Sequence, residues 1–307
     1  MNINPVMPLI RLFREEDSTG VSALFRVVYG EDYVYPEVYL PTMLSRYNAA
    51  RHWYSAVAIQ DGQVLGHATL WRNGRCPSSA ELALIAVHPQ ARGQGIATAL
   101  GRYLCDQAKE MGLGILTIKQ VSSHNHSQRL AQNLGFHTTG LLPDYVTSPF
   151  DQARPESIVL GCLPLQRWPF PELHWPVNWQ TWLTSVTQIF GQEPLKPAVP
   201  IDTGISIASH GGRLEVWIET QTTERVKEVT ELPAHKLIYV KLSVGEETLH
   251  AVQILQQAGF ACTGFVPGHH HRWEVLLVRG HSRKELALSC QFAHNLHQQS
   301  LFACAER

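Results

Sequence analysis

Runs of apolar residues alternate with turn residues through the first half of the chain, and their lengths are those of buried strands. Residues 54–59 and 64–70 flank an Asp-Gly pair, which is the strongest short-range signal of a hairpin. The run at residues 82–87 predicts a further strand, and a Gly-rich turn follows it. Residues 96–110 then have the composition of a helix that glycines end.

The other elements of this half complete a mixed pattern. A strand at residues 10–13 precedes a helix that Asp17 or Ser18 can cap and that extends to about Tyr29. The later elements are predicted to be a strand at 115–118, a helix at 127–134, and strands at 136–142 and 157–160. This order predicts an α/β protein of the α+β kind, with one mixed sheet.

The turn between the strand at 82–87 and the helix at 96–110 has the chemistry of an anion site. Strand, glycine turn and helix together collect unpaired backbone N–H groups at a helix N-terminus, and these groups attract an anion. Glycines let phosphates approach the backbone, and Arg92 adds a fixed positive charge. A Walker loop would need Lys after the glycines, and a dinucleotide fingerprint would need a third glycine where Thr98 stands. The residues expected to bind the anion are Arg92, Gly93, Gln94, Gly95, Ile96 and Ala97.

The turn resembles the (Gln/Arg)-x-x-Gly-x-(Gly/Ala) signature of the GNAT acetyltransferase superfamily, and the element order over residues 8–165 is similar to the GNAT fold. The run Leu134-Gly135-Phe136 also looks like the family's junction between a helix and a strand. The resemblance implies that the turn cradles the pyrophosphate of acetyl-CoA, a co-substrate, and that no metal takes part. It also implies that the preceding strand faces the thioester and pantetheine through the backbone of Ile85, Ala86 and Val87.

The same resemblance suggests catalytic residues. Glu81 aligns with the base glutamate of histone-acetylating relatives, and the alternative is a solvated carboxylate at the start of a strand. The tyrosine that many relatives use as general acid falls at Ala131, so that route is absent. His124, near the expected pantetheine, and Tyr145, on a later loop, are the candidates that remain. Ser127 is expected either to contact the cofactor or to cap a helix.

Aromatic side chains near the start of the chain suggest an acceptor pocket. Tyr33 and Tyr35 belong to a loop interrupted by prolines and are predicted to bind substrate, because a tyrosine offers both a flat face and a hydroxyl. The alternative is that they pack a helix against the sheet. Asp144 lies on the loop where relatives place substrate contacts, so it is a third substrate-binding candidate.

The second half of the chain repeats features of the first. Residues 165–178 are rich in proline and aromatic residues and read as a stiff connector. Beyond it, residues 259–267 echo residues 135–143 at a constant offset, and the flanking strands and helix recur in the same order. We therefore expect a tandem arrangement, with a GNAT domain at residues 1–165 and a degenerate GNAT-like domain at residues 166–307.

The second copy lacks the phosphate chemistry. Residues 220–225 stand where the turn would be and contain no glycine, while Glu224 would repel a phosphate. We expect this domain to bind no CoA and instead to close over the substrate side of the first domain or to form a dimer contact. Its last helix is predicted at residues 282–302.

Composition narrows the range of partners. The chain has 307 residues and a formal net charge of −1, so nothing suggests nucleic acid or an anionic membrane as a partner. Six cysteines without C-x-x-C spacing fit a reduced compartment, and His269-His270-His271 cannot all face one metal from an extended loop. The N-terminus lacks the features of a signal peptide, and the apolar runs are shorter than a bilayer span. A cytoplasmic location is therefore expected.

These features together predict an acyl-CoA-dependent N-acyltransferase. It would transfer acetyl from acetyl-CoA to a primary amine of a small molecule or amino acid, by direct attack of the amine on the thioester. The alternatives are a non-catalytic acyl-CoA sensor, suggested by the missing tyrosine, and an O-acyltransferase. A small-molecule amine is the expected partner, and the chain could form a homodimer.

Overall fold

The structure is a computed structural model that describes residues 7–72, 74–148, 155–196 and 204–302. The strands of its N-terminal half are β1 (Leu9–Leu12), β2 (Trp53–Gln60), β3 (Gln63–Arg72), β4 (Ser79–Val87), β5 (Ile115–Val121), β6 (His137–Thr147) and β7 (Pro155–Pro164). The helices of this half are α1 (Ser18–Tyr29), α2 (Pro41–Ala49), α3 (Ile96–Glu110) and α4 (His126–Asn133). The predicted hairpin is thus β2 and β3, and the helix predicted at 96–110 is α3.

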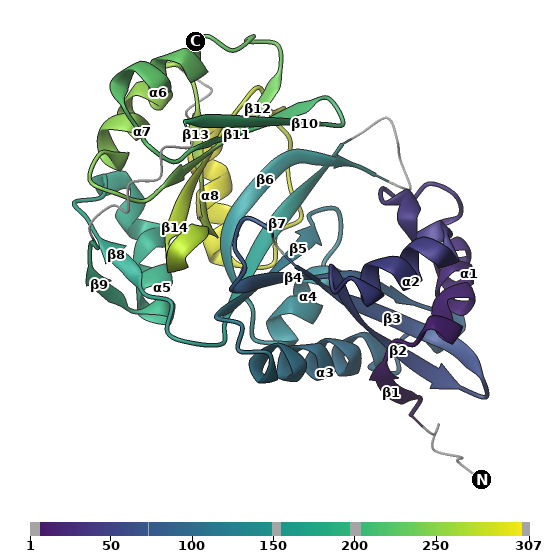
Figure 1. Cartoon of the computed structure of the whole chain (residues 1–307). Helices are drawn as coiled ribbons and strands as arrows, with labels where there is room; N and C mark the ends of the chain where they lie inside the picture. The colour runs from purple at the N-terminus through teal and green to yellow at the C-terminus, as the bar shows by residue number, and fades with distance from the viewer. Residues whose placement is uncertain (1–6, 73, 149–154, 197–203, 303–307) are drawn as a thin grey trace.

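The C-terminal half adds a second group of elements (Figure 1). Its strands are β8 (Phe170–Glu172), β9 (Gln192–Pro194), β10 (Ile205–His210), β11 (Arg213–Ile218), β12 (Leu237–Ser243), β13 (Ala261–Pro267) and β14 (Trp273–Arg279). Its helices are α5 (Gln180–Phe190), α6 (Thr223–Thr230), α7 (Thr248–Gln257) and α8 (Gln291–Phe302). Among the described residues, 12 strands form one sheet in the order β1-β2-β3-β4-β5-β7-β6-β13-β14-β12-β11-β10. The mixed sheet expected from the sequence is therefore confirmed, and it is continuous across both halves.

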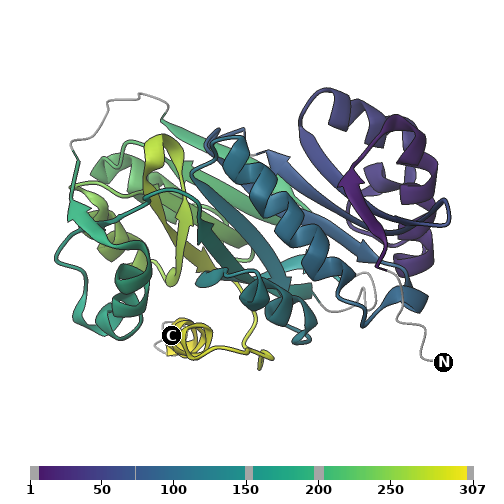
Figure 2. The same cartoon turned by 90° about the horizontal axis from the view of Figure 1, so that it is seen from below.

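Helices cover both faces of the sheet in the N-terminal half (Figures 1 and 2). Successive residues of β2 belong to different cores: Val57 packs with α1 and α2 around Phe25, whereas Ala56 and Ala58 pack with α3 around Leu100. Because side chains alternate along a strand, the two cores lie on opposite faces. This arrangement fixes both helix layers relative to β4, the strand that borders the site.

The strand pairing of the N-terminal half recurs in the C-terminal half. β4 and β5 are parallel, β5 and β7 are antiparallel, and β6 pairs with β7; likewise β11 and β12 are parallel, β12 and β14 are antiparallel, and β13 pairs with β14. The two groups meet where Gly140 of β6 pairs with Gly264 of β13. Gly264 has a φ of 120°, and a Cβ there would overlap the carbonyl oxygen of Thr139, so this junction requires glycine.

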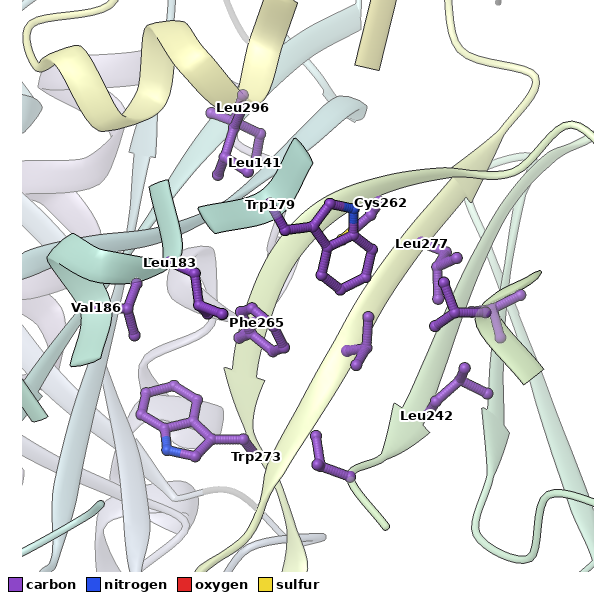
Figure 3. Close-up of a cluster of buried hydrophobic side chains, with 14 of the residues drawn as sticks. Leu141, Trp179, Leu183, Val186, Leu242, Cys262, Phe265, Trp273, Leu277 and Leu296 are labelled. Atoms are coloured by element: carbon purple, nitrogen blue, oxygen red, sulfur yellow. The ribbon is translucent and has the colours of Figure 1, made fainter. Parts of the chain in front are cut away.

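A core rich in tryptophan lies between α5, α8 and the sheet of the C-terminal half (Figure 3). Phe265 of β13 lies 5.4 Å, centroid to centroid, from Trp182, and Trp273 lies 4.9 Å from Phe190. Leu296 of α8 lies beside Leu141 of β6, so α8 packs across the junction of the halves. Each buried CH2 contributes about 0.8 kcal/mol, so the burial of these large side chains provides a large share of the stability of the C-terminal half.

Two expectations for this half need correction. The connector at residues 165–178 is more than a spacer, because Trp168, Phe170 and Trp175 are buried in the core. The last helix begins at Gln291 instead of 282, because residues 282–289 bond to other parts of the fold: the N–H of Ala287, for example, donates to the carbonyl of Ser122 at 2.9 Å. None of the helices that the structure describes is long and apolar enough to cross a membrane.

Candidate active site

A cavity opens where β4 and β5 separate. Their parallel pairing stops at Leu82 and Ile118, although both strands continue. At this point β4 has a bulge against β3, and Leu84 has a left-handed backbone with a φ of 52°. The buried ring of His67 supports the bulge through Nδ1, which lies 2.9 Å from the carbonyl oxygen of Leu84. The bulge turns β4 away from β5 and leaves a cavity of about 420 Å³ between them.

Most of the predicted cofactor residues meet at this cavity. Beyond Leu82 the side of β4 that faces β5 has no strand partner among the described residues, so its backbone groups can bond a ligand. Of the residues proposed from the sequence, ten line the cavity: Tyr33, Tyr35, Glu81, Ile85, Ala86, Val87, Arg92, Ala97, His124 and Ser127. The backbone of β4, the two ends of the predicted phosphate turn (Arg92 and Ala97) and the candidate base Glu81 therefore border one space, whereas Gly93, Gln94, Gly95 and Ile96 do not line it.

The glycine turn has the geometry of an anion cradle. Gly93 and Gly95 have φ values of 78° and 79°, and a Cβ at either position would meet nothing within 4 Å. They therefore serve backbone shape and leave the outer side of the turn open. Gly95 is the N-cap of α3, and no described side chain caps that helix. The first N–H groups of α3 thus point out of the turn beside exposed Arg92.

The side chains that begin α4 divide into two roles. The Oγ of Ser127 is buried at the cavity and has no hydrogen-bond partner within the described part of the chain. A ligand atom would satisfy it. Gln128 instead binds the C-terminal segment: its amide donates to the carbonyl of Ala287 at 2.7 Å and accepts the N–H of Ser289 at 2.9 Å. Gln128 therefore orients α4 against residues 282–289.

His124 lies at the mouth of the same cavity. Its ring is exposed, and its Nδ1 accepts the N–H of His126 at 3.3 Å, so it caps the first turn of α4. The ring of His126 lies 5.3 Å away, centroid to centroid. Because Nδ1 is engaged with the backbone, Nε2 is the His124 atom that can meet a ligand.

Glu81 stands at the inner end of the cavity and forms an ion pair with Lys119. Oε2 of Glu81 lies 2.9 Å from Nζ of Lys119, and each side chain is about a quarter exposed. Burial alone would lower the pKa of Lys119, but Glu81, Tyr145 and Tyr35 outweigh it and raise that pKa well above the ordinary value. Lys119 is therefore a permanent cation beside the candidate base.

The family to which the residues around this cavity belong can be identified from the sequence they share with known proteins. Residues 21–136 match the acetyltransferase (GNAT) family. The N-terminal half carries a GNAT acetyltransferase domain. No curated protein matches the chain.

Several solved structures are similar to part of the chain. An N-acetyltransferase from Staphylococcus aureus Mu50 is 24% identical, with a TM-score of 0.46 over 52% of this chain and 98% of that one. The ribosomal-protein-S18-alanine N-acetyltransferase from Escherichia coli is 19% identical, with a TM-score of 0.43 over 52% and 95%. A phosphinothricin acetyltransferase from Sinorhizobium meliloti, in complex with acetyl-CoA, is 21% identical, with a TM-score of 0.46 over 53% and 90%.

A second cavity, of about 830 Å³, joins the GNAT domain to the C-terminal half. Glu81 and Lys119 line it from one side, and Arg213, Glu215 and Lys241 line it from the other. Glu81 also lines the 420 Å³ cavity. The candidate base thus stands between the space bordered by the phosphate turn and the space shared with the C-terminal half.

Tyr145 of β6 connects the two sides of this second cavity. Its hydroxyl donates to Oε1 of Glu215 at 3.0 Å, and the Arg213 guanidinium lies 3.9 Å from its ring centre. Nζ of Lys119 lies 5.3 Å from the same centre. Burial would raise the pKa of Glu215, but Lys241, Arg213 and Lys119 lower it to about 2. Tyr145 is therefore held by a carboxylate that stays charged.

The structure places Asp144 differently from the other substrate candidates. Its backbone lies in a bulge of β6 with a φ of 54°. Its carboxylate lies 2.6 Å from Nζ of Lys284 and accepts the N–H of Ser282 at 2.6 Å. Burial would raise its pKa, but these two partners outweigh burial and lower it. The carboxylate thus secures the C-terminal segment, although Asp144 also borders the 830 Å³ cavity.

The tyrosines predicted near the acceptor pocket pack in a core and also border a cavity. Tyr29 and Tyr33 have ring centroids 4.5 Å apart, and Tyr35 lies 4.9 Å from Trp71 in a T-shaped contact. They pack with the core below α1, and they also line the 420 Å³ cavity. Burial raises the pKa of Tyr33 well above its ordinary value, so its hydroxyl remains protonated.

Sequence reasoning missed Lys119, Arg213, Glu215 and Lys241. A signal existed, because Lys119 and Lys241 are the single charged residues of strands that are mostly apolar. Glu81 pairs in register with Thr117, two residues before Lys119, and Glu215 pairs with Tyr239, two residues before Lys241. The ion pairs Glu81–Lys119 and Glu215–Lys241 therefore occupy equivalent positions in the two halves.

Proposed function

We propose that the protein transfers acetyl from acetyl-CoA to a primary amine of a small molecule or amino acid. The observation that carries the proposal is the placement of Glu81, which borders both the cavity of the phosphate turn and the cavity shared with the C-terminal half. A base at this boundary stands between a thioester on one side and an amine on the other.

The residues around the 420 Å³ cavity fit acetyl-CoA. The uncapped start of α3 suits a pyrophosphate, and the unpartnered Oγ of Ser127 suits an amide of the pantetheine arm. The β4 backbone from Ile85 to Val87 would bond the same arm and polarise the thioester oxygen. Acetyl-CoA itself supplies the activated acetyl group.

Proton transfer is assigned to residues at the two ends of the reaction. Glu81 takes the proton of the attacking amine, directly or through a water, while Lys119 keeps the carboxylate in place. His124, which lines the 420 Å³ cavity, is the candidate donor to the leaving thiolate. Tyr145 lines only the side shared with the C-terminal half and already donates to Glu215, so it suits acceptor positioning better than acid catalysis.

Direct attack of the amine on the thioester needs no enzyme nucleophile. Of the described cysteines, none lines the 420 Å³ cavity. Burial also raises the pKa of Cys162 and of Cys262 to about 12, which keeps both thiols protonated. This supports a single transfer step without an acyl-enzyme.

Residues 166–307 are proposed to be a degenerate GNAT-like domain. The recurrence of the strand pairing and of the Glu–Lys register supports this origin. Its counterpart of α3 is α6, whose N-terminus is capped by the Thr222 hydroxyl and carries Glu224 in its first turn. A capped N-terminus with an acidic residue offers no place for a pyrophosphate.

The phosphate site can be tested with two matched glycine variants. Gly95→Glu puts a carboxylate at the start of α3, where it should weaken acetyl-CoA binding by roughly 100-fold through repulsion. Gly62→Glu is the control: Gly62 also has a positive φ, of 75°, and open space, but it lies in the β2–β3 turn. Isothermal titration calorimetry should show loss of binding in Gly95→Glu only. Equal binding by both variants would refute the phosphate assignment.

Activity separates the enzyme from its alternatives. Release of the CoA thiol would be followed with a panel of amines and a matched panel of alcohols. Acetylation of amines supports the proposal, whereas turnover of alcohols alone would indicate an O-acyltransferase. Tight acetyl-CoA binding without turnover on any acceptor would identify a sensor.

A further inference from the structure

The C-terminal half contributes a cluster of cations to the 830 Å³ cavity. Nζ of Lys241 lies 3.0 Å from Oε2 of Glu215, and Nη2 of Arg213 lies 3.2 Å from Oε1. All three side chains are largely buried, with exposed fractions of 7 to 17%. One carboxylate therefore holds two cations side by side in a site with little solvent.

The two cations keep donors for a ligand. Lys241 has three N–H donors, of which Glu215 takes one. Arg213 has five N–H donors; its Nε donates to Glu215, and its Nη1 donates to the carbonyl of Tyr145 at 2.8 Å. A guanidinium and an ammonium fixed in this way match the oxygens of an oxyanion.

Charges around the whole cavity favour an anion. Its described walls carry the cations Arg72, Lys119, Arg213 and Lys241 and the carboxylates Glu81, Asp144 and Glu215. The charge of Asp144 is taken by Lys284, which does not line the cavity. Two positive charges remain, and the cations at one end of the cavity, Arg213 and Lys241, are largely buried, where an anion is attracted more strongly than at the surface.

An adjoining cavity of about 150 Å³ does not reverse this balance. It contains Arg75, which lies 3.8 Å from Glu219, and buried Glu274. Burial raises the pKa of Glu274 to about 7, so near neutral pH it carries only part of a charge.

The space between Glu81 and the cations determines how large a ligand can be if it contacts both. Lys119, the partner of Glu81, and Arg213 both lie against the ring of Tyr145. Glu81 and Arg213 also line one cavity, so a molecule that fills it can contact both. Trp217 forms part of the wall, held between the Arg75 guanidinium at 4.0 Å and Nζ of Lys241 at 4.6 Å from its ring centre.

We propose that Arg213 and Lys241 bind a carboxylate or phosphate group of the acceptor, whose amine lies at Glu81. The inference rests on the proposed function and narrows it to small amines that carry an oxyanion. The C-terminal half then determines which acceptors bind. Its Glu215–Lys241 pair is equivalent to Glu81–Lys119, but it binds the acceptor, whereas Glu81 takes the proton of the acceptor amine.

Two pairs of acceptors test the charge and its source. L-phenylalanine is compared with L-phenylalaninamide, and phosphoethanolamine with ethanolamine, by kcat/KM for CoA release. The wild-type protein should favour the anionic member of at least one pair by roughly 10-fold or more. A preference in the first pair indicates a carboxylate, and one in the second indicates a phosphate.

Variants separate an anion contact from structural damage. Arg213→Gln and Lys241→Gln should lower kcat/KM for the anionic acceptor roughly 10-fold more than for the uncharged one, since only the anionic acceptor loses a charged partner. The control, Lys227→Gln, removes an exposed charge from α6 and should retain the wild-type preference. Equal losses on both members of a pair, or no anionic preference in the wild type, would overturn the inference while leaving the acetyltransferase intact.

Binding without turnover keeps the inference testable if the proposed function fails. Isothermal titration of the same four compounds into the CoA-saturated protein measures the anion site directly. Binding of an anionic amine that Arg213→Gln weakens roughly 10-fold supports the site even when no acetyl is transferred. Absence of any binding or turnover preference for the anionic compounds overturns it.

Discussion

The histidine under the β4 bulge should make the protein sensitive to acid. His67 is fully buried, its Nδ1 is bonded to Leu84, and its Nε2 has no partner within the described residues. Burial lowers its pKa from 6.5 to about 4, against smaller opposing effects of the Leu84 carbonyl and Asp17. The folded protein therefore holds this ring neutral.

The sign and size of the effect follow from linkage. Below pH 6.5 the unfolded chain binds a proton at His67, whereas the folded protein binds it only near pH 4. Stability is therefore complete above pH 6.5, falls as the pH drops towards 4, and is constant below that value. The whole loss is about 3 kcal/mol, and about 2 kcal/mol of it falls between pH 7 and pH 5.

The assay is urea unfolding at pH 7 and pH 5 for the wild type and for His67→Met. Methionine cannot titrate, and its loss of the bond to Leu84 costs about 1–3 kcal/mol at either pH. His137, His281 and His297, whose pKa values burial also lowers, are unchanged and cancel in the comparison. The wild type should lose about 2 kcal/mol more than the variant between the two pH values. Equal losses would refute the assignment of the acid sensitivity to His67.

Two further predictions concern the base and the junction of the halves. Glu81→Gln should lower kcat at neutral pH by roughly 100-fold or more while acetyl-CoA binds as before, and the loss should shrink at high pH as the amine loses its proton unaided; an unchanged kcat would remove Glu81 from the mechanism. Gly264→Ala should lower the free energy of unfolding by about 3 kcal/mol or more, because a Cβ there overlaps the backbone of β6. Its control, Gly212→Ala, has a positive φ of 86° but open space, so it should lose only about 1 kcal/mol in the same denaturation assay; equal losses would show that the junction tolerates a side chain.

The GNAT half could be predicted from sequence because its signals are local. The Asp-Gly turn, the apolar run of β4 and the glycines before α3 each specify a neighbouring backbone, and the structure contains the predicted elements. The same holds for the backbone shape of the glycine turn, because the positive φ values of Gly93 and Gly95 depend on a few consecutive residues.

Other features depend on contacts that sequence spacing does not reveal. Asp144 stays a predicted substrate contact, but nothing in the sequence indicated that its carboxylate binds Lys284 and Ser282, more than a hundred positions away. Residues 282–290 have a composition that permits a helix, yet they form none, and residues 287 and 289 instead bond to Ser122 and Gln128. The cation cluster of Arg213 and Lys241 could not be predicted, because it depends on the continuous sheet that joins β11 and β12 to the strands of the N-terminal half.

The pairing of Gly140 with Gly264 also affects how the protein can be divided. If the halves were expressed separately, β6 and β13 would become outermost strands with unbonded N–H and C=O groups, and such strands are templates for aggregation. In the intact chain each strand masks the other, and the outermost positions fall to β1 and β10, of only 4 and 6 residues. The pairing with the C-terminal half therefore keeps the strand that carries Tyr145 from being an outer edge of the sheet.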